Sequence, residues 1–185
     1  MADPAIEGLP APRDDGAADH LPRLPLPAIA LVSTAGDRVA LNELIIRTVV
    51  FVFPSIGGID DALLDEWTAI PGARGCTPEA CAFRDRLGSF GSHRVHVVGL
   101  SGQPAHQQRD AVERLDLPYP LLSDERLELA ASLRLPTFEF RGQRYFKRVT
   151  LVVSGRRIEA ALYPVFPPEE AAEQALIWLA ENRPA

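Results

Sequence analysis

The chain has 185 residues, of which 46% are hydrophobic, and carries a formal net charge of −6 with an isoelectric point of about 5.2. This length and composition fit one soluble globular domain, and the acidic balance argues against a nucleic-acid partner and suits a small neutral substrate. No apolar run of about 18 or more residues is present and the N-terminus lacks a signal-peptide pattern. We therefore expect no membrane partner and a cytoplasmic protein with reduced thiols.

The expected elements alternate between strand and helix after an acidic N-terminal segment. Residues 1–25 are rich in Pro, Ala, Asp and Gly and are expected to be disordered or loosely packed, which leaves 26–185 as the folded domain. The elements expected there are a hairpin start at 39–41, a buried strand at 48–53, a cysteine-bearing helix, a buried strand at 95–100, helices at 105–115 and 124–133, strands at 138–140, 145–153 and 158–163, and a closing helix at 168–181.

This order predicts an α/β protein with a mixed central sheet flanked by helices. The two buried strands with the cysteine helix between them form a β-α-β unit, hence a parallel pair joined by a right-handed crossover. A late hairpin after such a start is what a thioredoxin fold contains, although the pattern alone also permits other α/β sandwiches.

Both cysteines of the chain, Cys76 and Cys81, lie at the start of the predicted helix. Thr77 is expected to N-cap this helix, with Pro78 at its first position and Glu79 as a negative charge near the positive end of the dipole. A cysteine at a helix N-terminus faces free backbone N–H groups, which favour the reactive thiolate. We therefore expect a depressed pKa at Cys76 and redox chemistry of sulfur.

The spacing of the two cysteines limits what they can form. Five residues of intact helix separate the two Cα atoms by about 7.5 Å of rise, and a disulfide rarely tolerates more than about 7 Å. A bond between them therefore requires the first helical turn to unwind. Two inert buried cysteines are another interpretation of the pair. A zinc site is a second, but the four histidines form no ligand pattern. A thioredoxin-like redox pair is a third, but it needs the spacing C-x-x-C.

The run Gly-Cys-Thr-Pro-Glu-Ala-Cys-Ala-Phe-Arg-Asp at 75–85 resembles the active-site segment of peroxiredoxins, in particular the Q type, also called bacterioferritin comigratory proteins. Pro-Leu-Leu-Ser-Asp at 120–124 is also similar to the family's sequence. The resemblance implies a thioredoxin-fold peroxidase in which Cys76 attacks a hydroperoxide and Cys81 then forms an intramolecular disulfide with it. It further implies thioredoxin or a similar dithiol as reductant and no metal or organic cofactor. We expect a monomer or homodimer.

The resemblance also assigns the other site residues. Arg148, at the start of a strand near the C-terminus, matches the family's arginine that stabilises the thiolate and donates to the peroxide. This role suits a guanidinium, which is always charged and carries several N–H donors. Arg84 and Arg74 are second candidates for that role. Thr77 and Glu79 complete the site, and Glu79 either orients the arginine or acts only as a helix-start charge.

Two positions depart from the family pattern. The family has a proline seven residues before its first cysteine, where this chain has Ala69. Three residues before that cysteine the family has a threonine whose hydroxyl bonds the sulfur and the peroxide, and this chain has Ala73 there. The loop from Ser55 to Gly75 resembles an insertion. Ser55 is a candidate for returning a hydroxyl to the site, and a plain loop serine is the alternative. The missing threonine favours a second function, a thioredoxin-fold redox sensor or binding module with little peroxidase turnover. A thiol–disulfide oxidoreductase is a further alternative, against which the C-x-x-x-x-C spacing argues.

Overall fold

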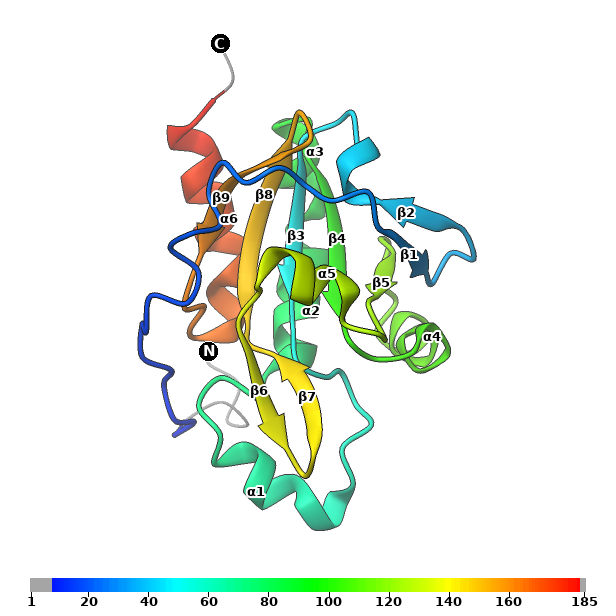
Figure 1. Cartoon of the computed structure of the whole chain (residues 1–185), viewed down its shortest axis with the longest axis vertical. Helices are drawn as coiled ribbons and strands as arrows, with labels where there is room; N and C mark the ends of the chain where they lie inside the picture. The colour runs from blue at the N-terminus through cyan, green and yellow to red at the C-terminus, as the bar shows by residue number, and fades with distance from the viewer. Residues whose placement is uncertain (1–7, 184–185) are drawn as a thin grey trace.

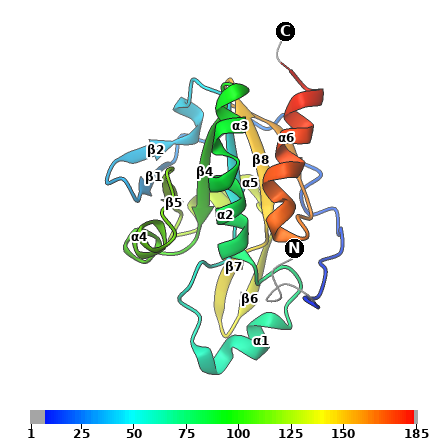
Figure 2. The same cartoon turned by 180° about the vertical axis from the view of Figure 1, so that it is seen from behind.

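The computed structural model describes residues 8–183 and contains a curved, mixed seven-stranded sheet with helices on both faces (Figures 1 and 2). The strands are β1 (Ala30–Ser33), β2 (Arg38–Ala40), β3 (Thr48–Val52), β4 (His96–Ser101), β5 (Leu121–Ser123), β6 (Thr137–Phe140), β7 (Gln143–Phe146), β8 (Val149–Ser154) and β9 (Arg157–Leu162). The α-helices are α1 (Leu64–Thr68), α2 (Cys76–Asp85), α3 (Leu87–Ser92), α4 (Ala105–Arg114), α5 (Glu128–Leu133) and α6 (Ala171–Glu181). Among the described residues no helix is both long and apolar enough to cross a membrane.

The order of strands in the sheet is β2-β1-β5-β4-β3-β8-β9, with β6 and β7 forming a separate hairpin. β3 lies in the interior of the sheet, between β4, to which it is parallel, and β8, to which it is antiparallel. All five of its residues are buried. Its continuous apolar run is explained by this position, because both faces of a central strand are covered. The predicted α/β class, the parallel β3–β4 pair and the mixed sheet are confirmed.

Alternate residues of β3 point into two separate cores. Val49 and Phe51 belong to the core under α2, α3 and α6, where Phe51 stacks on Phe83 of α2 with ring centroids 4.5 Å apart. Val50 and Val52 belong to the core under α5 on the other face. The end of β3 is therefore fixed by packing on both faces of the sheet, and the residues that follow it lie near the start of α2 (Figure 2).

Two expected elements are each divided in the structure. The cysteine helix ends at Asp85 and a second helix, α3, begins at Leu87, yet Phe83 and Phe90 still stack on one face with centroids 5.6 Å apart. The strand expected at 145–153 is divided into β7 and β8, with Lys147 and Arg148 between them. Asp124 is not adjacent to α5, but its carboxylate accepts the N–H groups of the first turn of that helix, which is the capping function expected of it.

Residues 15–25 of the N-terminal segment contact the folded domain, so the expected loose packing of 1–25 does not hold for that part. Leu21 is fully buried in the core under α5, and Pro25 forms a β-bridge with Arg157 of β9. Asp15 accepts bonds from Lys147 (2.6 Å) and the Tyr163 hydroxyl (2.8 Å). A few leucines among the prolines are enough to anchor the segment. Residues 1–7 lie outside the described residues, and the boundary at residue 25 stays a prediction.

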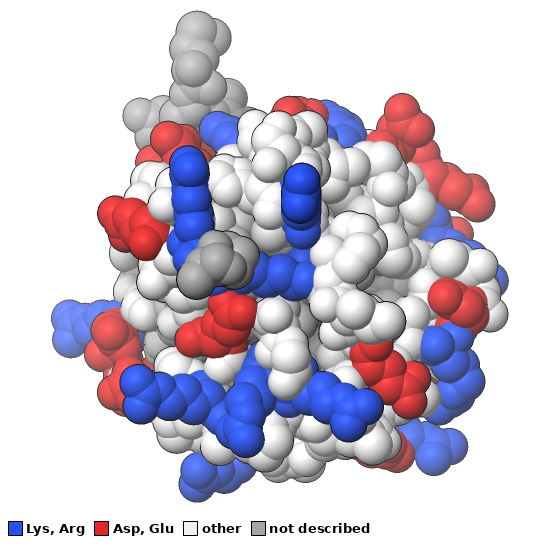
Figure 3. All heavy atoms as spheres, turned by 90° about the horizontal axis from the view of Figure 1, so that it is seen from above, with Lys and Arg blue, Asp and Glu red and all other residues white. Residues whose placement is uncertain are grey.

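The end of the molecule remote from α1 is charged and shows no broad surface of one sign. Viewed from that end, Lys and Arg side chains are interspersed with Asp and Glu (Figure 3).

Candidate active site

Helix α2 begins at Cys76 itself, two residues earlier than the sequence pattern indicates. The residue before it, Gly75, has φ +105°, and the first intrahelical bond runs from the Glu79 N–H to the Gly75 carbonyl (3.1 Å). The predicted N-cap at Thr77 is wrong: Thr77 is the second helical residue and Pro78 the third. The cause is Gly75, because its positive φ, which glycine adopts freely, lets the chain enter the helix before the threonine is reached.

Arg148, at the residue before β8, reaches across to the start of α2. Its Nη2 lies 3.4 Å from the Cys76 sulfur and also donates to the carbonyls of Arg74 (3.1 Å) and Gly72 (3.4 Å), while Nη1 forms an ion pair with Glu79. All of this is buried: Arg148 is 3% exposed, Cys76 4% and Glu79 0%. Of the predicted site residues, the structure brings these three into direct contact. Glu79 faces the arginine rather than solvent at the helix start.

Burial and charge act in opposite directions on the sulfur. Burial raises the pKa of Cys76, and the Glu79 carboxylate adds to this, whereas the Arg148 guanidinium and a hydrogen bond from the Ser55 main-chain N–H lower it; the net direction is upward. The depressed pKa expected for Cys76 is therefore not found at this buried sulfur, because loss of water outweighs the effect of the arginine.

Glu79 is perturbed by the same burial. Burial raises the pKa of Glu79 to about 7 although Arg148 opposes the shift, and its Oε1 atom has no partner among the described residues. Glu79 therefore changes charge near neutral pH. When it takes a proton, the negative charge that raises the pKa of Cys76 disappears and Arg148 faces the sulfur alone.

A pocket of about 410 Å³ opens at Cys76. One wall is made by the inserted segment, which is not a plain loop: it contains a 3₁₀ turn at Asp61–Leu63 and helix α1. Trp67 of α1 is 3% exposed and packs on the β6–β7 hairpin, with centroids 5.5, 5.3 and 4.9 Å from Phe138, Phe140 and Tyr145. The residues lining the pocket are Ser55, Gly57, Ile59, Asp61, Leu64, Trp67, Arg74, Gly75, Cys76, Thr77 and Pro78.

A buried cysteine beside an arginine, at the start of a helix and at the floor of a pocket, is the arrangement on which the sequence resemblance depends. The sequence pattern of the AhpC/TSA family matches residues 22–159. The chain belongs to the AhpC/TSA family. The family and the fold together support a thiol peroxidase, and the resemblance to Q-type peroxiredoxins is confirmed.

Named relatives and solved structures agree with this family. A Mycobacterium tuberculosis protein provisionally named a peroxiredoxin is 33% identical over 106 residues, which cover 57% of this chain and 69% of that protein. Chloroplastic peroxiredoxin Q of Suaeda salsa is 31% identical over 57% of this chain and 49% of its own length. The crystal structure of the peroxidoxin BcpB from M. tuberculosis superposes with a TM-score of 0.71 at 27% identity, covering 89% of this chain and all of that one. A Xanthomonas campestris peroxiredoxin Q structure shares the fold, with a TM-score of 0.68 at 20% identity over 87% of this chain and 98% of the other.

The second cysteine of this AhpC/TSA family member lies further along the same helix. Cys81 is partly exposed, both cysteines are free thiols, and α2 is intact from Cys76 to Asp85. The middle of the helix is anchored to the rest of the fold, since the Tyr119 hydroxyl donates to the Ala80 carbonyl (2.6 Å). The structure therefore corresponds to the dithiol form, with the helix whole.

The two alternative arginines do not take the place of Arg148. The Arg84 guanidinium donates to Asp85 and to the Leu115 carbonyl (2.7 Å). Arg74 lines the pocket, but its side chain donates to the Thr68 hydroxyl (3.0 Å), and it is its main-chain carbonyl that bonds Arg148.

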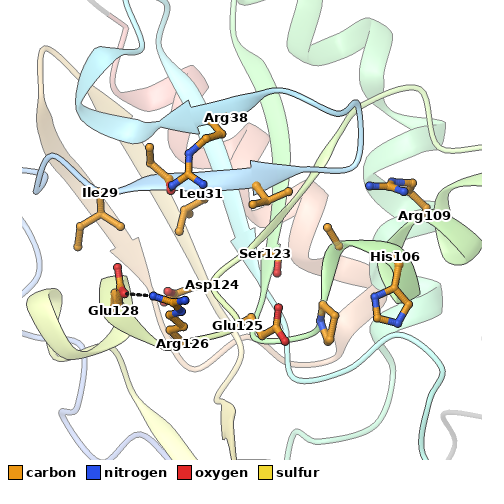
Figure 4. A pocket seen from close by; sticks show the side chains of 14 residues that line it. Ile29, Leu31, Arg38, His106, Arg109, Ser123, Asp124, Glu125, Arg126 and Glu128 are labelled. Atoms are coloured by element: carbon orange, nitrogen blue, oxygen red, sulfur yellow. Dashed lines mark hydrogen bonds and ion pairs between the residues drawn. The ribbon is translucent and has the colours of Figure 1, made fainter.

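A second pocket, of about 500 Å³, lies between β1, the start of α4 and the β5–α5 connection (Figure 4). Arg38, His106 and Arg109 point toward it, but it contains neither cysteine nor any residue that contacts them. Within residues 8–183 no cluster of three or more His, Cys, Asp or Glu side chains could hold a metal ion. The chemistry of the family is therefore to be sought at Cys76.

Proposed function

We propose that the chain is a thiol-dependent peroxidase that reduces hydrogen peroxide and alkyl hydroperoxides through Cys76. In this proposal Cys81 resolves the oxidised sulfur as an intramolecular disulfide, which thioredoxin or a similar dithiol reduces. The observation that carries the proposal is the 3.4 Å contact between the Arg148 guanidinium and the Cys76 sulfur at the floor of a pocket. A fixed cation with several donors beside a nucleophilic sulfur is what attack on a peroxide requires.

The first step is attack of the Cys76 thiolate on the terminal oxygen of the hydroperoxide. A sulfur–oxygen bond forms and the oxygen–oxygen bond breaks, so the sulfur is oxidised to a sulfenic acid and the remaining oxygen leaves as alkoxide or hydroxide. The leaving oxygen then takes a proton from water. Arg148 donates to the oxygens on which negative charge develops, in a site from which water is largely excluded.

Formation of the thiolate depends on Glu79 as well as on Arg148. The pKa of Cys76 is raised while Glu79 is ionised, and protonation of Glu79, whose pKa is about 7, removes that unfavourable charge. Glu79 thus has two roles in this proposal: its ion pair orients Arg148, and its titration sets how readily the thiolate forms.

The second step requires α2 to open at its start. About 7.5 Å of helical rise separates the two cysteines while the helix is whole, which is too far for a disulfide. Once the first turn unwinds, the Cys81 thiolate attacks the sulfenic sulfur, a disulfide forms and hydroxide leaves to become water. An external dithiol then returns both cysteines to thiols by exchange.

The size of the pocket supports alkyl hydroperoxides as substrates. A volume of about 410 Å³ is in the range of small-molecule sites and far exceeds what hydrogen peroxide fills. Its inserted wall presents Ile59, Leu64 and Trp67, which suits an apolar tail. A Xanthomonas campestris bacterioferritin comigratory protein of known structure, 20% identical to this chain, is described as having alkyl peroxide reduction activity. Since the cycle needs an external reductant, we propose that the protein acts in the cytoplasm, where thiols are kept reduced. We further propose that it is a monomer or homodimer.

A coupled assay tests the proposal. Native protein with thioredoxin, thioredoxin reductase and NADPH should consume NADPH upon addition of peroxide, and Cys76→Ser should abolish this consumption. Cys81→Ser should react once and then stop. Rapid formation of the disulfide with NADPH consumption no faster than background would instead identify a redox sensor, and reduction of insulin would identify a thiol–disulfide oxidoreductase.

A further inference from the structure

Ser55 lies at the Cys76 sulfur, although 21 positions separate the two residues in the sequence. It follows the end of β3 by three residues and is 9% exposed, and it lines the pocket that opens at the cysteine. Its main-chain N–H faces the sulfur and lowers the pKa of Cys76, and both residues line the same pocket. The side chain is therefore positioned by a buried central strand rather than by a free loop.

The Ser55 hydroxyl has a fixed orientation. Its Oγ donates to the Gly57 carbonyl at 2.7 Å. A serine hydroxyl has one hydrogen and two lone pairs, and the hydrogen is engaged in this bond. What remains available to a molecule in the pocket is an acceptor.

The site also needs an acceptor, and Ser55, Asp61 and Thr77 line the pocket with side chains that can supply one; of these, Ser55 is the residue whose main chain also contacts the sulfur. The contacts to the sulfur described above come from donors, the Arg148 guanidinium and the Ser55 main-chain N–H. The Ala73 carbonyl lies 3.8 Å from the sulfur, where it accepts from the Cys76 thiol, and Ala73 is fully buried. A hydroperoxide carries an O–H on the oxygen that the sulfur attacks, and this hydrogen needs an acceptor once the peroxide has left water.

We propose that Ser55 is a further catalytic residue of this site: its hydroxyl accepts the O–H of the terminal peroxide oxygen and holds that oxygen in line with the Cys76 sulfur. Arg148 donates to the peroxide oxygens from the other side. The sulfur–oxygen bond forms, the oxygen–oxygen bond breaks, the terminal oxygen keeps its hydrogen in the sulfenic acid, and the leaving oxygen takes a proton from water. This inference rests on the proposed peroxidase function.

The test compares two reactions of the same sulfur in Ser55→Ala. Reaction of Cys76 with peroxide should slow by about tenfold, equal to about 1.4 kcal/mol, because one hydrogen bond in the transition state is lost. Alkylation by iodoacetamide and the thiolate titration should be unchanged, because the main-chain N–H remains and an alkylating agent presents no O–H. Ser55→Thr, which keeps a hydroxyl, should recover the peroxide rate.

The outcomes separate this inference from the proposed function. An unchanged peroxide rate in Ser55→Ala would overturn the role of the hydroxyl and leave the peroxidase intact. An equal fall in the peroxide and alkylation rates would show that Ser55 only shapes the loop, and would also overturn it. Native protein whose Cys76 does not consume peroxide at all would refute both the peroxidase and the role of Ser55.

Discussion

Replacing Gly75 by alanine should destabilise the protein by about 2–5 kcal/mol, because two effects add. At φ +105° an alanine is strained by at least about 1–2 kcal/mol. Its Cβ would also lie 2.3 Å from Cγ and 3.0 Å from Cβ of Pro168, and such overpacking typically costs about 1–3 kcal/mol. In a chain of this length each kcal/mol lowers the melting temperature by about 2–4 °C, so thermal unfolding should show a fall of about 4–20 °C.

Two other glycines separate these effects. Gly142 has φ +78° with no atom within 4 Å of an added Cβ, so Gly142→Ala should show the backbone strain alone. Gly88 lies in α3 with a negative φ and open space, and Gly88→Ala should stabilise slightly, by about 0.5–1 kcal/mol. If Gly75→Ala were no more destabilising than Gly142→Ala, the close approach of Pro168 to Gly75 would add nothing to the backbone strain, and the reasoning would be refuted.

Three further predictions concern the sulfur site. Arg148→Met should raise the pKa of Cys76 and slow its reaction with peroxide by more than about tenfold, because the positive charge that lowers this pKa is lost. Glu79→Gln should lower the pKa of Cys76, because the negative charge that raises it is lost. Thiolate absorbance against pH measures both effects, and an unchanged titration in either variant would show that the replaced residue does not act on the sulfur. Leu64→Ser should reduce kcat/KM for cumene hydroperoxide more than for hydrogen peroxide. The control is Leu63→Ser, at a neighbouring half-buried leucine outside the pocket, which should change neither value. Equal effects of the two substitutions would exclude an apolar wall that contacts the substrate. Oxidation should expose the amides of the first turn of α2 to hydrogen exchange, and equal protection in both redox forms would show that the two cysteines of one chain do not pair.

Features that depend on local pattern were predictable from the sequence. The apolar runs of β3 and β4 predicted the parallel pair that the structure contains. The assignment of Arg148 to the sulfur came from the family resemblance, since no local rule connects it to Glu79, 69 positions away.

Features decided by distant contacts were not predictable. Trp67 is buried by aromatic residues of the β6–β7 hairpin about 70 positions further on, so nothing in its own segment indicates a helical wall. The pKa of Cys76 depends on how completely neighbouring elements exclude water, which the segment around the cysteine does not show. The start of α2 is set by the backbone conformation of Gly75, which competes with a good capping residue two positions later.

Mass spectrometry after one equivalent of peroxide tests the central claim most directly. In the native protein the account predicts the loss of the two thiol hydrogens and a peptide linking Cys76 to Cys81. In Cys81→Ser it predicts a sulfenic acid at Cys76 that a trapping reagent labels, and in Cys76→Ser no oxidation. A label in Cys76→Ser with none in Cys81→Ser would contradict the assignment and make Cys81 the residue that attacks the peroxide.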